Sequence, residues 1–540
     1  MKNLKQSFLI LASVATLYSC KKAETVQDIQ PQTNASTQIA DEVMVLNEND
    51  LNKAIEEQMK NSQEGLDWNK SPINVVWSAI QHSQDKLLFV GYKPAQVSEL
   101  EVQKHLLESS GSRTTSWTSE KGALLNLILE EEAKINPSVK QEDILVSEMD
   151  ELSAIVIRIS NPNTLKKMKK SDFLRYAEPT YEPSKHYENQ QIATESILPQ
   201  NFGCGAYSPV TVSFLTPNPN SIAMESWNYG YHRIKGAWAS NVTGKGIEVM
   251  VLDGGHFDQQ QLLTTYINNG LIKGRSFRKQ SFISNSVNDP QDNCGHGTAL
   301  AGVIGAPRMD NGFGFDREQS MMGVAYGCNL YMAKVVNDVV IDTAEEVAAV
   351  ANAFNTAANS SSVRIISMSL GRIGNVTTIA DAIRNAKNRG KLIFVASGTA
   401  PWLVSVFSNW NGASSIVFPA NMVNETVAVS GIKTNFTRAD EAVVGAETDF
   451  VVVMQNDNLP AGTAKTPLGM SKSSRPYPST IGGSSVATAT MAGMAALVWS
   501  KFPGATANDI LYRLRIYSNF GNNRHPQFGW GSCDVSKAIQ

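Results

Sequence analysis

From about residue 227 to the C-terminus, short apolar runs alternate with longer segments of helical periodicity. The clearest run is 247–253 (IEVMVLD), which is apolar until it ends on a carboxylate, a pattern typical of a parallel strand buried on both faces. Further strands are predicted at 330–336, 364–370, 391–397 and 426–432, and helices after Gly297 and at 343–358, 378–388 and 486–501. This alternation predicts an α/β fold, a doubly wound, mainly parallel sheet with helices on both faces. Ligands bind beyond the carboxyl ends of such strands, so Asp253 stands where chemistry is expected.

The pattern before residue 227 is different. Residues 21–84 are polar, rich in Gln, Asn, Glu and Ser, and are predicted to form a tether. Residues 85–183 contain strand patterns at 87–92 and 152–159 and helical patterns near 100–107 and 122–135, which predict a small α+β domain. Residues 184–226 are rich in proline and turns and are predicted to be a linker to the domain at 227–540. Two folded units suit a chain of 540 residues, because single cores rarely grow beyond about 250–300 residues.

The first twenty residues read as a targeting signal. Lys2 and Lys5 precede an apolar run at 7–19 that is too short to span a bilayer as a helix. The sequence Leu17-Tyr18-Ser19-Cys20 resembles the bacterial lipobox, in which the cysteine becomes the lipid-bearing N-terminus; an ordinary cleaved signal is the alternative. Both interpretations predict an extracytoplasmic protein. It would be held in the cell envelope by a lipid on Cys20, or secreted after processing.

Composition and charge narrow the choice of function. The 42% hydrophobic and 18% charged content is typical of a soluble globular protein. A net charge of -3 offers no basic surplus for phosphates, so nucleic acid is not expected as a partner. Four cysteines remain in an oxidising compartment, where two disulfides could form in three connectivities: Cys204, Cys294, Cys328 and Cys533. A zinc site near His296 is disfavoured, because the expected C-x-x-C pairs are absent.

Three short segments carry candidate chemistry. In 249–255 (VMVLDGG), Asp253 ends a strand before two glycines, and in 294–305 (CGHGTALAGVIG), His296 lies between glycines ahead of a helix of small residues. In 482–493 (GGSSVATATMAG), Ser485 stands at a glycine-opened helix N-terminus, where the helix dipole and free N–H groups favour a developing negative charge. Each segment alone also has a purely structural explanation, such as a turn, a locally bonded histidine or an N-cap.

Together the segments resemble the signatures of subtilisin-like serine peptidases, in that family's order of Asp, His and Ser. Further matches are 323–325 (GVA), 366–371 (ISMSLG), 418–420 (FPA) and 528–531 (FGWG). The resemblance implies an endopeptidase that forms an acyl-enzyme on Ser485, with His296 as general base and Asp253 orienting it. His256 is rejected as the base, because it lacks the Gly-His-Gly-Thr setting.

The resemblance also implies partners. Ser369, Leu370 and Gly371 correspond to the family's substrate-binding strand edge, which pairs with an extended peptide. Segments 154–157 (AIVI) and 174–179 (LRYAEP) resemble the family's inhibitory propeptide, which templates folding and blocks the cleft until it is cut. The implied partners are polypeptide substrates and the chain's own propeptide. No cofactor is required, and no metal ligand is assigned, although Asp310, Asn311 and Asp316 leave a structural calcium site open.

The chain departs from the family near the oxyanion site. The family places an Asn donor after an apolar strand and a glycine, and here Thr399 follows Gly398. Thr399 is therefore the tentative oxyanion donor. Ala489 and Thr490 replace a Pro and a following His in the nucleophile's helix. These departures leave one alternative, a catalytically silent peptide-binding protein on the same fold.

Overall fold

The computed structural model describes residues 43–62, 66–108, 115–183, 204–205, 207–209, 223–283, 289–309, 320–399, 416–459, 465–475 and 477–540. Residues 43–540 form one compact unit. The predicted signal peptide with Cys20, and the calcium hypothesis at Asp310, Asn311 and Asp316, lie outside the described residues.

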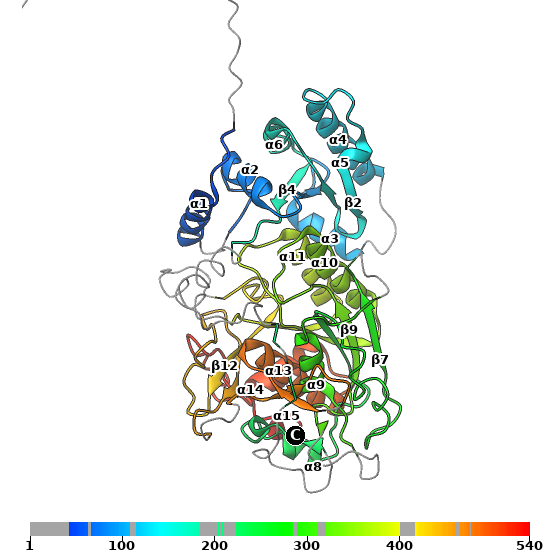
Figure 1. The fold of residues 1–540 in the computed structure, drawn as a ribbon, viewed down its shortest axis with the longest axis vertical. Coiled ribbons are helices and arrows are strands. Elements are labelled where there is room, and N and C mark those ends of the chain that lie inside the picture. The colour runs from blue at the N-terminus through cyan, green and yellow to red at the C-terminus, as the bar shows by residue number, and fades with distance from the viewer. Residues whose placement is uncertain are drawn as a thin grey trace, which may run out of the picture. The chain divides into compact units, whose positions relative to one another are not determined.

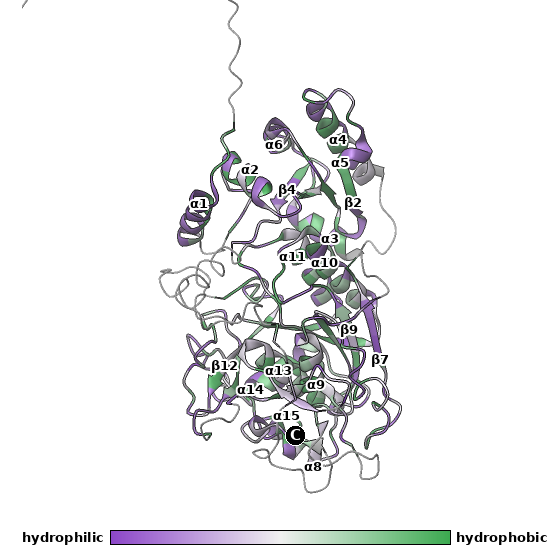
Figure 2. Cartoon of the chain, viewed as in Figure 1, coloured by the Kyte–Doolittle hydropathy of each residue, from purple (hydrophilic) through white to green (hydrophobic). Residues whose placement is uncertain are grey.

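A seven-stranded sheet of order β13-β12-β11-β10-β6-β9-β7 forms the centre of the C-terminal domain, and its strand pairs are parallel. The strands are β6 (Glu248–Asp253), β7 (Phe277–Ser281), β9 (Asn329–Lys334), β10 (Val363–Met368), β11 (Leu392–Ala396), β12 (Val427–Lys433) and β13 (Phe450–Gln455). The predicted parallel sheet is thereby confirmed. The edge strand β7 is hydrophilic (Figure 2), which discourages pairing with another chain.

Helices cover both faces of this sheet, because successive residues of each strand point to opposite sides. Met250 and Leu252 of β6 belong to a hydrophobic cluster with α10 (Ala344–Asn359) and α11 (Thr377–Asn388). Val249 and Val251 belong to a second cluster with α9 (His296–Gly305) and α13 (Gly483–Lys501). Figure 1 shows α9 and α13 together on one side, and α10 and α11 on the other. The predicted α/β architecture is confirmed in this respect as well.

Shorter elements complete the C-terminal domain. They are β5 (Ala223–Met224), η2 (Trp227–Gly230), α8 (Ile234–Ala239), β8 (Ser320–Met321), β14 (Leu468–Met470), β15 (Pro478–Thr480), α14 (Ala507–Ile516) and α15 (Val535–Ala538). Strand β5 lies inside the segment predicted as a linker, and it pairs with β8 in a two-stranded parallel sheet.

The N-terminal domain contains a four-stranded antiparallel sheet of order β2-β3-β1-β4. Its elements are α1 (Glu48–Asn61), α2 (Ile73–His82), β1 (Leu88–Tyr92), α3 (Glu99–Glu108), α4 (Thr115–Glu132), α5 (Gln141–Ile144), β2 (Leu145–Met149), η1 (Asp150–Leu152), β3 (Ala154–Ile157), α6 (Pro162–Met168) and β4 (Leu174–Pro179). The predicted strands at 87–92 and 152–159 correspond to β1 and β3. The domain is α+β, as expected.

The tether prediction is wrong for the described part of residues 21–84. Two helices, α1 and α2, stand there, and α2 packs on α6 and β4. Helix α1 buries Leu51, Ile55 and Met59, which are spaced four residues apart on one helical face. Apart from Ala54, its other residues are polar and make the segment hydrophilic on average (Figure 2), so the apolar stripe is hard to recognise. The N-terminal domain therefore begins well before residue 85.

The two domains share one hydrophobic cluster and are joined by charged contacts at helix starts. The Glu178 carboxylate accepts hydrogen bonds from the N–H and the hydroxyl of Thr377, the first residue of α11, at 2.7 and 2.5 Å. Asp85 accepts the N–H of Ala344, the first residue of α10. Carboxylates are favoured at helix N-termini, so these contacts stabilise the interface.

Candidate active site

An aspartate and a histidine meet at the carboxyl end of the central strand. Asp253 ends β6, and His296 begins α9. The Nδ1 atom of His296 lies 2.9 Å from Oδ1 and 3.0 Å from Oδ2 of Asp253, and the two residues are 3% and 0% exposed. Because Nδ1 faces the carboxylate, Nε2 is the ring nitrogen left for proton transfer.

Glycine allows this close approach of helix to strand. A Cβ atom on Gly297 would lie 2.6 Å from the carbonyl oxygen of Gly255 and 3.0 Å from Cβ of Asp253. Any side chain there would push α9 away from β6 and would lengthen the contact between His296 and Asp253. The small residues of the motif are therefore a packing requirement of the pair.

The surroundings of His296 favour its charged form. Burial by itself lowers the pKa of His296, but the neighbouring Asp253 carboxylate outweighs burial, and the pKa is raised above its usual value. A second buried carboxylate, Asp292, acts in the same direction. Asp292 also accepts the N–H of Gly295 and both the N–H and hydroxyl of Thr298, at 2.6, 2.8 and 2.7 Å, which fixes the start of α9.

Ser485 is the third residue of α13, whose helix packs against α9. It is half-buried, and its carbonyl oxygen accepts a hydrogen bond from the Ser369 hydroxyl at 3.2 Å. In the part of the chain that the structure describes, no hydrogen bond joins Ser485 Oγ to the ring of His296. Catalytic hydrogen bonds often shorten only when substrate binds. The structure thus shows the Asp253 and His296 pair as a direct contact, and it places Ser485 on the neighbouring helix.

Thr399 lies at the start of the nucleophile's helix. Its Oγ1 atom accepts the N–H of Ser484 at 2.7 Å and lies 2.8 Å from the Ser484 hydroxyl oxygen. The Ser484 hydroxyl in turn accepts the N–H of Gly398 at 3.2 Å. A Cβ atom on Gly483, where φ is +73°, would lie 2.6 Å from Thr399 Oγ1. The hydroxyl of Thr399 therefore joins the end of β11 to the first turn of α13.

The predicted substrate-binding edge follows β10. Ser369 and Leu370 are buried, and Gly371 pairs with Val340 in an isolated parallel bridge. The hydrogen bond from Ser369 to Ser485 places this edge beside the candidate nucleophile. His256, by contrast, is fully buried and packs on the ring of Phe277, with centroids 4.7 Å apart. Burial lowers the pKa of His256, and the nearby Asp258 carboxylate, whose Oδ1 lies 3.7 Å from Nδ1, only partly opposes this shift.

A disulfide brings one further side chain to the site. Cys204 is bonded to Cys294, whereas Cys328 and Cys533 are buried free thiols. Of the two disulfides that these four cysteines could form, the structure contains one. Tyr207, three residues after Cys204, lies beside His296, with the ring centroids 6.4 Å apart and the ring planes at 61°. The even number of cysteines signalled a bridge, but nothing in the sequence signalled Tyr207.

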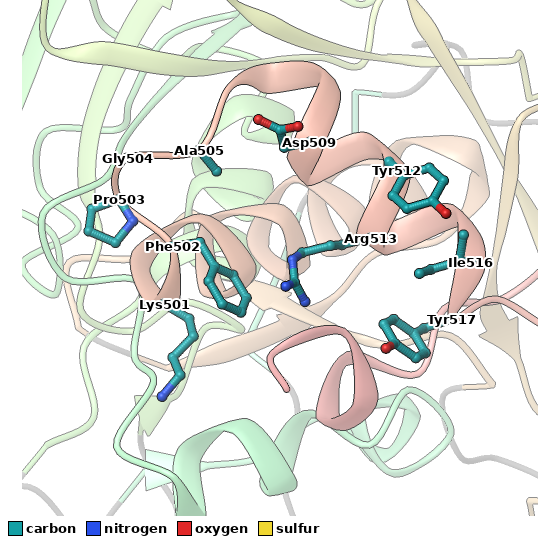
Figure 3. Close-up of a pocket in the computed structure, with 10 residues that line it drawn as sticks. All are labelled: Lys501, Phe502, Pro503, Gly504, Ala505, Asp509, Tyr512, Arg513, Ile516 and Tyr517. Carbon is teal, nitrogen blue, oxygen red and sulfur yellow. The ribbon is translucent and has the colours of Figure 1, made fainter.

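A surface hollow of about 670 Å³ lies elsewhere. It is lined by the end of α13 and by α14, and Figure 3 shows Phe502 and Arg513 within it. The Arg513 guanidinium carbon lies 3.8 Å from the centroid of the Phe502 ring. Because Ser485 and this hollow are at opposite ends of α13, the hollow is not part of the active site.

Two kinds of feature are absent from the described ranges. None of their helices has the length and hydropathy of a membrane span. Nor do these ranges contain three or more His, Cys, Asp or Glu side chains grouped to hold a metal ion.

The parallel sheet, the Asp253 and His296 pair and the serine in the first turn of α13 define the class of α/β serine hydrolases. A model of the subtilase family matches residues 244–531. M-protease of Shouchella clausii strain KSM-K16 is 28% identical over 322 residues, 59% of this chain and 71% of that protein. Subtilisin BL of Lederbergia lenta is 30% identical over 283 residues, 52% of this chain and 86% of that protein. The crystal structure of MycP1 with its N-terminal propeptide removed aligns at a TM-score of 0.44 and 22% identity, covering 58% of this chain and 98% of that one.

The chain belongs to the subtilase family and is a serine-type endopeptidase. The resemblance seen in the sequence is confirmed at this level. Its substrates are therefore polypeptides, and subtilases need no cofactor for this chemistry.

Proposed function

We propose that this chain is a secreted, lipid-anchored endopeptidase precursor, with Asp253, His296 and Ser485 as its catalytic triad. The observation that carries the proposal is the buried contact between Asp253 and His296, 2.9 Å long, next to the helix that bears Ser485. Each of the three residues stands in the motif that the family uses for that role.

The proposed reaction is acyl transfer. Ser485 Oγ attacks the scissile carbonyl carbon, and Nε2 of His296 takes the serine proton and returns it to the leaving amine. Asp253 holds the imidazole by Nδ1 and stabilises the imidazolium that forms. Water then hydrolyses the acyl-enzyme on Ser485 by the same proton transfers in reverse.

The oxyanion site is proposed to combine a backbone donor with Thr399. The N–H groups of the first helical turn lack partners within the helix, and Ser485 lies in that turn of α13. The Thr399 hydroxyl hydrogen has two candidate acceptors, the Ser484 hydroxyl and the oxyanion. When it bonds to the oxyanion, Ser484 keeps its N–H contact to Thr399 Oγ1. The Thr399 hydroxyl therefore bonds Ser484 at the start of α13 in the free protein, and it donates to the oxyanion during the reaction.

The N-terminal domain is proposed to be an inhibitory propeptide. Its contacts support this role, since Glu178 and Asp85 cap the two helices that cover one face of the catalytic sheet. The buried ion pair of Arg175 with Asp381 adds a charged contact between the domains, with 2.5 Å between Nη1 and Oδ2. Cleavage between the domains would release the block.

The proposed location is extracytoplasmic. A lipid on Cys20 would hold the precursor in the cell envelope, and cleavage in the linker before Cys204 would free the catalytic domain from that anchor. Cleavage after Cys204 would leave the N-terminal part of the chain attached to the catalytic domain, because Cys204 is bonded to Cys294 of that domain.

Labelling with a fluorophosphonate tests the proposal. We expect the processed protein to be labelled on Ser485, and a Ser485→Ala variant to remain unlabelled. A matched control is Ser484→Ala, in which the neighbouring serine is removed and Ser485 stays. A folded, processed protein that does not react would instead support the alternative of a silent peptide-binding domain.

A further inference from the structure

Arg372 directly follows the proposed substrate-binding edge, and its side chain is fully buried. Its Nη2 atom donates hydrogen bonds to the carbonyl oxygens of Tyr181 and Thr180, at 2.9 and 3.4 Å. Its Nε atom lies 3.3 Å from Oε2 of Glu182 in an ion pair whose partners are 0% and 1% exposed. Its Nε and Nη1 atoms make no hydrogen bond among the described residues. The guanidinium thus retains donor capacity while it is buried.

Glu182 is held by more than this charge. Its Oε1 and Oε2 atoms accept the N–H of Ile373 at 3.0 and 3.2 Å. The carboxylate is therefore bound by a guanidinium and a backbone N–H of consecutive catalytic-domain residues. The guanidinium, which supplies charge, and the N–H, which supplies a hydrogen bond, both come from the catalytic domain, and the acid comes from the N-terminal domain.

The two groups that bind the carboxylate, the Arg372 side chain and the Ile373 N–H, remain on the catalytic domain when the N-terminal domain is removed. The backbone of Arg372 pairs with Phe418 in an antiparallel bridge, which holds it in the catalytic domain. Among the described residues, the polar partners of its side chain all belong to the N-terminal domain: Thr180, Tyr181 and Glu182. Removal of that domain would therefore uncover a positive charge next to the proposed substrate-binding edge.

The chain direction relates this site to the scissile bond. Ser369 contacts Ser485, and Arg372 lies three residues further along, about 10 Å in an extended chain. Glu182 precedes the predicted linker, so it is N-terminal to any bond that is cut there. A substrate aligned along the same edge would bring a residue about three positions before its scissile bond to Arg372.

We propose that Arg372 is a specificity-determining residue that selects substrates with a Glu or Asp about three positions N-terminal to the scissile bond. Glu182 fills this site in the precursor as a built-in substrate side chain. The inference rests on the proposed function, because it names the substrate class of the same active site. A purely structural contact between the domains is the competing explanation.

Matched peptides test the inference on the processed enzyme prepared from the full chain. Three sets of peptides are compared, in which the varied residue lies two, three or four residues before the cleaved bond. Within each set, the peptides differ only in whether this residue is Glu, Gln or Lys. We expect kcat/KM for Glu to exceed that for Gln by about tenfold at one position, through KM, because hydrogen bonds to charged groups are worth about this factor. Arg372→Gln should abolish the difference, and Arg389→Gln, at the far end of α11, should preserve it.

A second variant keeps the test decisive if Arg372→Gln does not fold. Glu182→Gln leaves Arg372 intact, so the processed enzyme should keep its preference for Glu. The released N-terminal domain of this variant should inhibit about tenfold more weakly, because it loses the ion pair with Arg372. Equal inhibition by the parent and the variant would overturn the role given to Glu182.

The two hypotheses fail in different ways. An enzyme that cuts Glu and Gln peptides equally at every position contradicts the specificity inference and leaves the proposed function intact. An enzyme that cuts no peptide and does not react at Ser485 contradicts the proposed function itself.

Discussion

The ring of Tyr207 stands edge-on to the ring of His296, with 6.4 Å between the ring centroids. Tyr207 also packs on Gly295, where a Cβ atom would lie 2.8 Å from the Tyr207 ring, and its carbonyl oxygen accepts the N–H of Lys472 at 3.0 Å. A residue far from the triad in sequence is thereby fixed beside the proposed general base.

Removing the Tyr207 ring should loosen that base. We expect Tyr207→Ala to lower kcat/KM about three- to tenfold, because an aromatic contact contributes about 0.5–1.5 kcal/mol. Tyr207→Phe keeps the ring and is the matched control. Steady-state kinetics on one peptide measure both, and a Phe variant as slow as the Ala variant would assign the effect to the hydroxyl.

The cysteines should divide into one bridge and two inert thiols. Cys204 and Cys294 are 90 residues apart in the sequence, and loss of such a bridge should lower the free energy of unfolding by about 2–5 kcal/mol. Burial raises the pKa of Cys328 to about 11 and that of Cys533 to about 12. We therefore expect neither thiol to react with iodoacetamide at pH 8 in the folded protein.

Alkylation and mass spectrometry check both parts of this prediction. Unfolding without reductant should expose Cys328 and Cys533 alone among the four cysteines after Cys20. A Cys204→Ser, Cys294→Ser variant measures the stability change by urea denaturation. Rapid labelling of Cys328 in the folded parent would contradict the burial on which the prediction depends.

The activity should follow the protonation of His296. The neutral imidazole accepts the serine proton, so the active form is lost as the pH falls through the pKa of His296. Burial lowers this pKa, but the Asp253 carboxylate outweighs burial and raises it above the ordinary value of 6.5. The acid limb of kcat/KM should therefore have its midpoint above pH 6.5, and a midpoint clearly below it would contradict the electrostatics described for the pair.

Thr399 should matter for the chemical step more than for substrate binding. Thr399→Val keeps the shape and removes the hydroxyl, so we expect kcat to fall by about 10²-fold with little change in KM, as for the loss of an oxyanion donor. The variant's melting temperature is the control, since the hydroxyl also bonds Ser484. A decrease in kcat of less than threefold would mean that the hydroxyl only stabilises the start of α13 and does not bond the oxyanion.

Local patterns made much of the fold predictable. The apolar run of 247–253 predicted β6, because a strand covered on both faces excludes polar side chains. Strand β13 contains a similar apolar run of three valines. It was not predicted, because no recognisable sequence motif lies within it. Helix α1 was missed because it is mostly polar: three buried apolar residues in fourteen are enough to hold it against an apolar partner surface.

The site was predictable only where its chemistry is local. Glycines stand within two residues of Asp253, His296 and Ser485 in the sequence itself, so the candidates and their order could be recognised. Tyr207 stands near a disulfide that joins distant parts of the chain, and Arg372 contacts Glu182, which precedes it by 190 positions in the sequence. Such contacts are set by tertiary packing, which sequence periodicity does not encode.

The central claim is tested most directly by mass spectrometry of the purified precursor beside its Ser485→Ala variant, each incubated alone and with unfolded casein. The account predicts that only the parent is cleaved between the two domains and degrades casein, while the variant stays intact. If both proteins are folded by circular dichroism and neither changes, the assignment of Asp253, His296 and Ser485 as an active triad is contradicted.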